Sequence, residues 1–100
     1  MSEFRLSPEA EAELDGIWIR IARESGNVDI ATRVVDSIAE RFWLLARHPY
    51  MGRRHDDLRP GLRAFNANDY VIIHRIMEDD VVLILHVAHG SRDIAGLLGP

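Results

Sequence analysis

The sequence of 100 residues contains no cysteine and no lysine, and its apolar segments are short. Without cysteine the chain has no disulfide, no thiolate metal site and no cysteine nucleophile. Without lysine it has no amine for Schiff-base chemistry, and all 12 cationic side chains are arginines capable of planar, bidentate contacts. No apolar run approaches the roughly 18 residues that span a bilayer, and the N-terminus lacks a basic segment followed by an apolar one. These absences predict a cytoplasmic protein without membrane association.

The composition indicates one globular domain over residues 1–100, because 47% of the residues are hydrophobic. The formal net charge of -4 argues against nucleic-acid binding as the main function, since nucleic-acid-binding domains usually carry an excess of basic residues. We expect protein partners and no direct sequence-specific nucleic-acid binding. No histidine has a carboxylate at metal-ligand spacing, and His86 and His89 are expected on opposite faces of one strand. The sequence therefore predicts no metal and no cofactor.

The first half of the chain predicts a short strand and two helices. A strand candidate at 4–6 precedes Ser7, which suits a helix cap, and Pro8, which suits the first helical position. Apolar residues then recur at helical spacing until Ser25 and Gly26, and a second such stripe follows a possible cap at Asn27 and ends near residue 47. The short connection predicts an antiparallel helical hairpin.

The second half predicts a loop over 50–60, strands at 62–67, 70–76 and 81–89, and a short helical tail at 94–98. The fold class expected is α+β: an N-terminal strand, a helical hairpin packed on an antiparallel sheet, and a short helical tail, in the order β-α-α-β-β-β.

A four-residue turn at 77–80 would place Ile76 opposite Val81 and so determine which side chains share a face of the sheet. One face would then meet the helices, and the other would stay uncovered although it is markedly apolar. We hypothesise that this second face binds a partner. Its expected members are Val71, Ile73, Arg75, Val82, Ile84, His86 and Ala88.

Three side chains are candidates for catalysis. Arg75, His86 and Arg92 have the chemistry to stabilise a phosphorane-like state and to move protons during RNA cleavage. The alternative is structural: Arg92 pairs with Asp93 or caps the tail, and Arg75 extends at the hairpin edge. No serine lies in a nucleophile-elbow sequence.

The two tryptophans lie in the predicted helices. Trp18 falls on the apolar stripe of the first helix, whereas Trp43 lies beside the stripe of the second. We therefore expect Trp43 to be the more exposed of the two.

These residues, taken in order, resemble the ParE branch of the ParE/RelE toxins of bacterial type II toxin–antitoxin systems. The resemblance covers nearly the whole chain and supports the α+β fold predicted above. It rests on the segments Phe4-Arg5-Leu6-Ser7-Pro8-Glu9-Ala10, Leu14-Asp15-Gly16-Ile17-Trp18, His48-Pro49-Tyr50-Met51-Gly52-Arg53, Asp57-Leu58-Arg59-Pro60-Gly61-Leu62-Arg63, Tyr70-Val71-Ile72 with Arg75, and His89-Gly90-Ser91-Arg92-Asp93.

ParE-like toxins are associated with poisoning of DNA gyrase, whereas RelE-like relatives cleave mRNA on the ribosome with basic residues on the open sheet face. Several groups of the RNA-cleaving branch are missing: Val71 stands where arginine is expected, Leu62 and Ala64 stand near the expected lysines, and the tail has no tyrosine. His86 also departs from the ParE pattern, in which arginine is common, and His74 stands where an aromatic residue is usual.

The resemblance implies a toxin that inhibits gyrase by binding and is neutralised by a ParD-like antitoxin. Two alternatives remain open, namely a ribosome-dependent mRNA endoribonuclease using Arg75, His86 and Arg92, and a binding module without toxicity. The residues implied for target binding are Arg59, Arg63, His89 and Arg92. The residues implied for antitoxin binding are Trp18, Trp43, Val71, Ile73, Arg75, Val82, Ile84 and His86.

Overall fold

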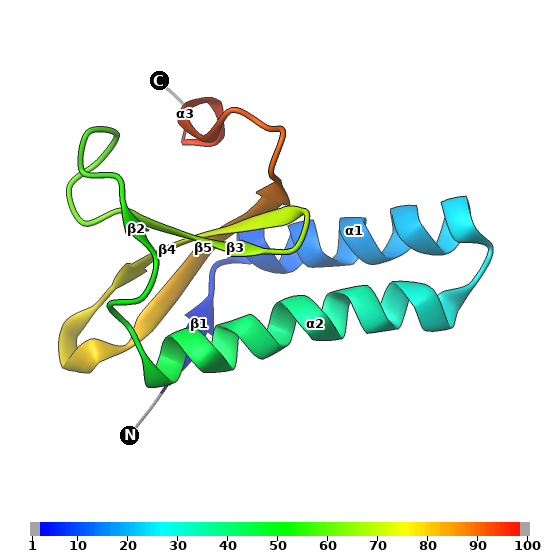
Figure 1. Cartoon of the computed structure of the whole chain (residues 1–100), viewed down its shortest axis with the longest axis horizontal. Helices are drawn as coiled ribbons and strands as arrows, with labels where there is room; N and C mark the ends of the chain where they lie inside the picture. Colours follow the sequence, from blue (N-terminus) through cyan, green and yellow to red (C-terminus); the bar gives the residue numbers. More distant parts are fainter. Residues whose placement is uncertain (1–2, 99–100) are drawn as a thin grey trace.

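Two long helices form one layer of the structure, a computed structural model that describes residues 3–98 (Figure 1). Helix α1 covers Pro8–Ser25 and begins at Ser7, whose side chain accepts a hydrogen bond from the Ala10 amide. It ends at Gly26, which adopts the left-handed conformation (φ 65°) that favours glycine. Helix α2 covers Val28–Arg47 and is capped by the Asn27 side chain. The predicted helical hairpin is confirmed. Within residues 3–98, no helix is both long and apolar enough to cross a membrane.

The second layer is a five-stranded sheet in the order β1-β5-β4-β3-β2. The strands are β1 (Phe4–Leu6), β2 (Arg53–Arg54), β3 (Arg63–Ala67), β4 (Tyr70–Ile76) and β5 (Val82–His89). The sheet is mixed rather than antiparallel throughout, because β1 pairs in parallel with β5 after the chain has passed through both helices. Strand β2 lies inside the segment expected to be a loop. A short helix α3 (Ile94–Leu97) follows β5, and the α+β class is confirmed.

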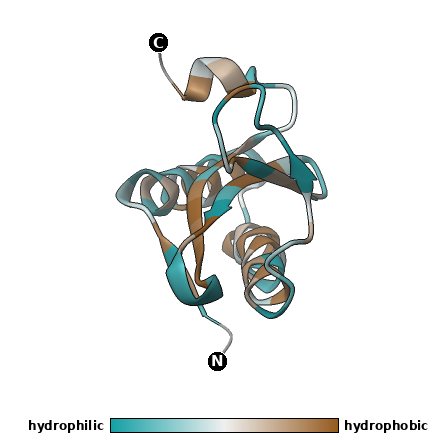
Figure 2. Cartoon of the chain, turned by 90° about the vertical axis from the view of Figure 1, so that its left-hand side faces the viewer, coloured by the Kyte–Doolittle hydropathy of each residue, from teal (hydrophilic) through white to brown (hydrophobic). Residues whose placement is uncertain are grey.

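The hydrophobic core lies between the helices and one face of the sheet. Figure 2 shows the central strands coloured as hydrophobic, with a hydrophilic turn at one end of the sheet. Phe42, Ile38 and Leu45 of α2 are almost completely buried, as are the sheet residues that they cover. The buried members of this cluster are Ala10, Ile17, Ile38, Phe42, Leu45, Ala67, Tyr70, Ile72, Val82, Ile84 and Val87.

The predicted register between β4 and β5 is wrong for the first half of β5. Ile76 lies opposite Val82 rather than Val81, because residues 77–81 all belong to the connection, which contains the 3₁₀ turn η1 (Glu78–Asp80). Asp79 and Asp80 both have positive φ there, and the Met77 amide donates to the Val81 carbonyl at 2.7 Å. The additional residue in the turn reverses the predicted face of the side chains at 82–85, which come before the second half of β5.

A β-bulge then restores the predicted alternation in the second half of β5. His74 lies opposite Ile84, whereas Ile73 lies opposite His86, so Leu85 is the additional residue of the bulge. Ile84 and Val87 are both buried in the core, which leaves Leu85 and His86 on the other face of the sheet. The bulge therefore separates a segment whose facing was predicted wrongly from one whose facing was predicted correctly.

Candidate functional site

The face of the sheet turned away from the helices is the candidate site, and we call it the outward face. Strand pairing defines it: Leu83 lies between Arg5 and Arg75, and His86 lies opposite Ile73. Arg53 pairs with Ala64, which is itself the neighbour of Ile73. The outward-facing strand residues are Arg5, Arg53, Ala64, Asn66, Val71, Ile73, Arg75, Leu83, Leu85, His86 and Ala88.

Two residues expected on this face lie on the other. Val82 and Ile84 are fully buried and belong to the core beneath the helices, so their predicted place on an open surface is wrong. The longer turn before β5 is the cause. Ile73 does face outward, but its exposed fraction is 0%, so it forms part of the interior of this side and not an accessible contact.

The chain covers part of the outward face itself. The segment after α2 and helix α3 both lie on that side of the sheet (Figure 1). Arg59 donates to the Leu98 carbonyl at 2.5 Å, which connects the two segments. The loop also has internal contacts at Asp56. Its carboxylate accepts hydrogen bonds from the Gly61 amide and from the Arg54 side chain, and these lower the pKa of Asp56, the Gly61 contact having the larger effect. The covered region lies toward Val71, which lines a hollow together with His55 of the loop and Ile94 of α3, whereas Arg5 and Arg75 on either side of Leu83 are exposed.

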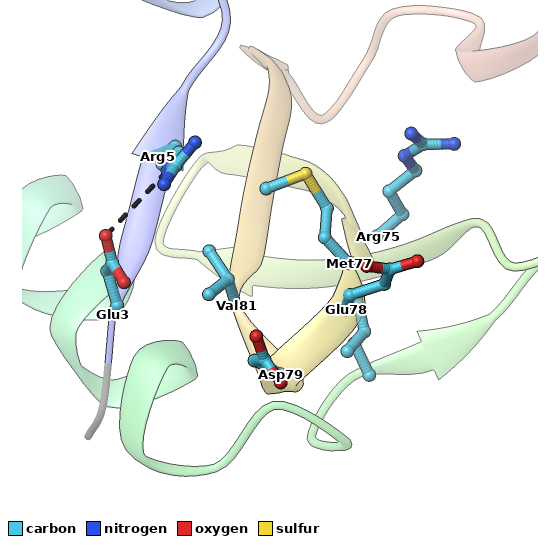
Figure 3. A pocket seen from close by; sticks show the side chains of 8 residues that line it. Glu3, Arg5, Arg75, Met77, Glu78, Asp79 and Val81 are labelled. Carbon is cyan, nitrogen blue, oxygen red and sulfur yellow. Dashed lines mark ion pairs between the residues drawn. The ribbon is translucent and has the colours of Figure 1, made fainter.

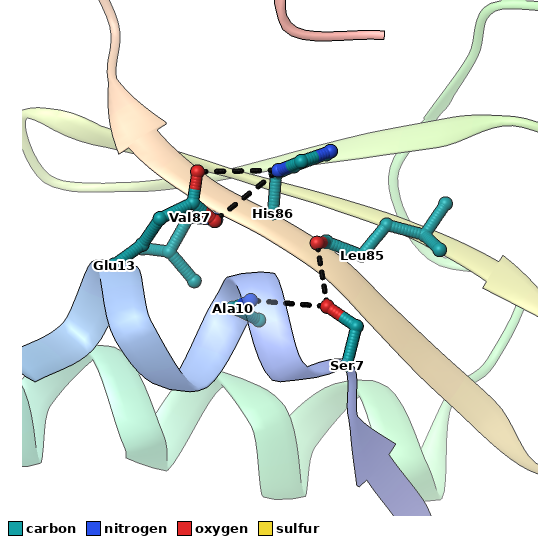
Figure 4. A network of polar contacts seen from close by, with 6 residues as sticks. All are labelled: Ser7, Ala10, Glu13, Leu85, His86 and Val87. Atoms are coloured by element: carbon teal, nitrogen blue, oxygen red, sulfur yellow. Dashed lines mark hydrogen bonds and ion pairs between the residues drawn. The ribbon is translucent and has the colours of Figure 1, made fainter.

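His86 is held by a carboxylate from α1, as Figure 4 shows. Its Nδ1 lies 3.2 Å from both carboxylate oxygens of Glu13, and the Val87 amide donates to Glu13 Oε1 at 3.0 Å. A carboxylate only accepts hydrogen bonds, so Nδ1 carries a proton and, in the neutral ring, Nε2 is the acceptor. The two side chains are 18% and 24% exposed, which shields the interaction from solvent.

The Glu13 contact also completes the edge of β5 beyond the end of β1. Ser7 donates its amide to the Ile84 carbonyl at 2.9 Å and its hydroxyl to the Leu85 carbonyl at 2.8 Å. Glu13 then accepts a hydrogen bond from the Val87 amide, the next donor along this edge of β5. The start of α1 therefore takes the place of a neighbouring strand here. Sequence reasoning did not find Glu13 because 73 residues separate it from His86.

The three catalytic candidates do not form one cluster. Arg75 and His86 share the outward face but are not direct cross-strand neighbours. Arg92 follows the end of β5 in an exposed turn, where its amide donates to the His89 carbonyl. Among residues 3–98, no hydrogen bond or ion pair joins any two of the three side chains, and no group of three or more acidic, histidine or cysteine side chains is arranged to hold a metal.

The residues implied for target binding lie in different settings. Arg63 donates to the carbonyls of Tyr50 and Gly52 and lies over the Tyr50 ring, so it supports the loop. The imidazole of His89 is hydrogen bonded to Ser91 and packs edge-on against Tyr70. Arg59 is occupied by the tail, as described above, and Arg92 is exposed.

The aromatic residues of α1 and α2 match expectation. Trp43 is 57% exposed and makes an edge-on contact with Phe4 of β1, with ring centroids 4.7 Å apart. Trp18 is half-buried and its indole N–H donates to Thr32 at 3.1 Å, which links the two helices. The exposed Trp43 ring beside an edge strand is a feature typical of interfaces.

Comparison with known proteins identifies the family. The model of the family described as the ParE toxin of type II toxin-antitoxin systems, parDE, matches residues 4–94. The chain belongs to the ParE toxin family. It is 33% identical over 87 residues to Toxin ParE3 of Caulobacter vibrioides, covering 87% of this chain and 85% of that protein. It is 28% identical to Toxin ParE1 of Mycobacterium tuberculosis, covering 93% and 94% respectively.

Solved structures agree with the fold of a ParE toxin. A chain of the chromosomal ParDE toxin–antitoxin system from P. aeruginosa has a TM-score of 0.75 at 22% identity, over 89% of this chain and 96% of that one. A chain of the RelBE2 toxin–antitoxin complex from Mycobacterium tuberculosis has a TM-score of 0.61 at 20% identity, over 88% and 96%. At these identities the likeness concerns the fold alone.

Proposed function

We propose that this chain is a single-domain cytoplasmic toxin that inhibits DNA gyrase by binding and is neutralised by a ParD-like antitoxin. The match of the ParE family model to residues 4–94 carries the proposal. The relatives named ParE toxins, with most of their length covered, support it. A toxin of this kind needs accessible binding surfaces rather than a set of reacting groups, and the outward face and the Trp43 region provide them.

The antitoxin surface that we propose is smaller than the sequence suggested. It keeps Trp43, Arg75 and His86, which are exposed or half-buried, together with Trp18 and Val71 at its margins. It omits Ile73, Val82 and Ile84, because side chains with no exposed area make no contact with a partner unless the fold opens. An antitoxin that contacts both the outward face and Trp43 would pass around the β1 edge of the sheet, between the two regions.

A second function, cleavage of mRNA on the ribosome, is favoured by one observation. The Glu13 carboxylate holds Nδ1 of His86, and this leaves Nε2 available as a proton acceptor on the outward face. Arg75, two residues along β4 from the partner of His86, supplies a positive charge on the same face. This candidate stands second because the three groups make no contact with one another.

Two assays on the purified wild-type chain separate these functions. The first measures inhibition of gyrase supercoiling together with the accumulation of cleaved DNA, and the second measures cleavage of mRNA on translating ribosomes. We expect gyrase inhibition that is reversed by a ParD-like antitoxin, and no RNA cleavage.

Matched variants make the assays decisive. His86→Gln and Arg75→Ala should leave supercoiling inhibition in place if these residues serve antitoxin binding, whereas either change should abolish RNA cleavage if they serve catalysis. RNA cleavage that depends on Arg75 and His86, with gyrase unaffected, would replace the first function by the second. If neither assay responds but the antitoxin binds, the chain is a binding module without toxicity.

A further inference from the structure

Two arginines flank one apolar side chain on the open part of the outward face. Arg5 of β1 and Arg75 of β4 both lie opposite Leu83 of β5, so the three form one row across the sheet. Since neighbouring strands are about 4.8 Å apart, the two arginine Cα atoms are about 10 Å apart, and side chains of this length can reach a single anion between them. The row therefore has the geometry of a clamp with an apolar floor.

Neither arginine is committed to another part of the protein. The ion pair of Arg5 with Glu3 is 3.8 Å long, and its side chains are 65% and 52% exposed, so it contributes little. Arg75 is exposed and forms no ion pair or side-chain hydrogen bond within residues 3–98. Arg75, which has no partner within residues 3–98, and Arg5, whose ion pair with Glu3 is weak, are therefore both available to a negatively charged group of a partner.

A hollow of about 780 Å³ is lined by the two arginines of this row, and by Met77 and Val81 rather than by Leu83 (Figure 3). Met77 and Val81 lie between the two arginines in the view, and Arg5 and Arg75 stand on opposite sides. Three carboxylates also line the hollow: Glu3, which lies beside Arg5, and Glu78 and Asp79 of the β4–β5 turn. The hollow thus combines an apolar floor, two cations and an acidic rim.

This combination favours a polypeptide over a nucleic acid. Single-stranded nucleic acids are usually held by aromatic side chains that stack on bases, and the outward-facing strand residues include no phenylalanine, tyrosine or tryptophan. A polyphosphate carries a charge on every unit and would be repelled by the carboxylates of Glu3, Glu78 and Asp79 more strongly than a single carboxylate held between the arginines. An extended peptide that carries one carboxylate among apolar side chains would satisfy the arginines and cover Leu83 and Met77.

We propose that the hollow between Arg5 and Arg75 binds an acidic side chain of the antitoxin, within an apolar extended segment that crosses the outward face at Leu83. This inference rests on the proposed function and adds to it the chemistry of the segment. Arg5 was not among the residues expected from sequence, and it enters because β1 pairs in parallel with β5.

The test compares charge-reversal variants of the full-length chain. Arg5→Glu, Arg75→Glu and the double variant are titrated against the cognate ParD-like antitoxin by surface plasmon resonance at low and moderate salt. Arg23→Glu is the matched control, because it makes the same charge change at an exposed site near the far end of the helical hairpin. Thermal unfolding of each variant checks that these exposed substitutions leave the fold intact.

We expect each single reversal to weaken binding by about tenfold and the double variant by about a hundredfold, mostly through faster dissociation. The control should stay within about twofold, and all differences should shrink at higher salt. Changing one antitoxin carboxylate to arginine should restore binding to Arg75→Glu, which identifies the partner side chain. Such a rescue is not expected from a merely structural defect.

Two results would overturn the inference. If the double variant binds the antitoxin as tightly as the wild type, the hollow is not part of the interface, although the toxin assignment stands. If a labelled single-stranded RNA oligonucleotide loses binding in the double variant while the antitoxin does not, the arginines serve nucleic acid. Failure of the wild-type chain to bind the antitoxin at all would instead remove the proposed function together with this inference.

Discussion

The two faces of the sheet show how one set of strands serves two purposes. On the helix-facing side, Ile72, Val82 and Ile84 are fully buried by α1 and α2. On the outward side, only part of the surface is covered by the chain's own loop and tail, and the row of Arg5, Leu83 and Arg75 is left open. The first face stabilises the fold, and the second is available to a partner.

The difference arises from which residues lie at the boundary between the faces. Adjacent residues of β5 differ in burial: Ile84 is buried, whereas Leu83 is half-buried. Glu13 reaches past the edge of β5 to hold His86 on the outward side. His74 is the exception on the helix-facing side, because its ionisable ring is buried and has no hydrogen-bond partner among residues 3–98.

The largest effect should come from the adjacent residues of β5. Ile84→Ala should lower the free energy of unfolding by about 2–5 kcal/mol, because it removes buried surface and leaves a cavity. Leu83→Ala should lower it by about 1 kcal/mol or less, since Leu83 is already partly in contact with water. Urea unfolding followed by circular dichroism measures both. An equal or greater loss for Leu83→Ala would mean that the shorter turn predicted from sequence is the correct one.

A second, smaller effect should come from His74 and depend on pH. Burial, and to a lesser extent the charge of Arg63, lowers the pKa of His74 from 6.5 to about 4. The folded protein then binds fewer protons than the unfolded chain between these values, so stability is retained above pH 6.5 and falls as the pH drops toward 4. The shift corresponds to a loss of about 3 kcal/mol.

Replacing His74 tests this contribution. Neither ring nitrogen of His74 has a hydrogen-bond partner within residues 3–98, so His74→Leu should give equal or higher stability at pH 7.5. It should also reduce the loss of stability between pH 6.5 and 4. His48→Gln, at an exposed position, is the control and should leave the pH dependence unchanged. An unchanged pH dependence in His74→Leu would contradict the prediction.

The smallest effect should come from the side chain that joins the two faces. Glu13→Ala should lower the free energy of unfolding by about 1–3 kcal/mol, because the Val87 amide and His86 Nδ1 lose their partner. Glu13→Gln should cost less, since its carbonyl oxygen still accepts from Val87. Glu11→Ala, at an exposed site on the same helix, should stay within about 0.5 kcal/mol.

Two measurements check the role of Glu13. Urea unfolding gives the three stabilities, and ¹⁵N NMR of the imidazole should show the proton on Nδ1 of His86 in the wild type but not in Glu13→Ala. Equal stability of Glu13→Ala and Glu11→Ala, with an unchanged imidazole spectrum, would refute the contact.

Local signals predicted most of the elements. Ser7 followed by Pro8 indicated the start of α1, and Gly26 followed by Asn27 indicated the break between the helices, because caps act within a few residues of the chain. Strands β4 and β5 were also expected close to their observed ends. The exposure of Trp43 followed from its place beside the apolar stripe of α2.

The candidate site was predicted less well, because it depends on register. The length of the β4–β5 turn and the bulge at Leu85 decide whether Val82 and Ile84 face the helices, and a run of five apolar residues at 81–85 gives no alternation to choose between the phases. Ile73 was correctly assigned to the outward face, but its burial by other segments was not foreseeable from its own strand.

The sequence by itself indicated the family through its motifs, and it indicated the helical hairpin and most of the succession of elements along the chain through periodicity, caps and turn residues, which act locally. The tertiary structure decided which side chains meet across long separations: Glu13 with His86, and Arg5 with Arg75 on either side of Leu83. Such contacts depend on a parallel strand pair, an additional turn residue and a bulge. Each is set by how the whole sheet packs against the helices rather than by the residues at that point.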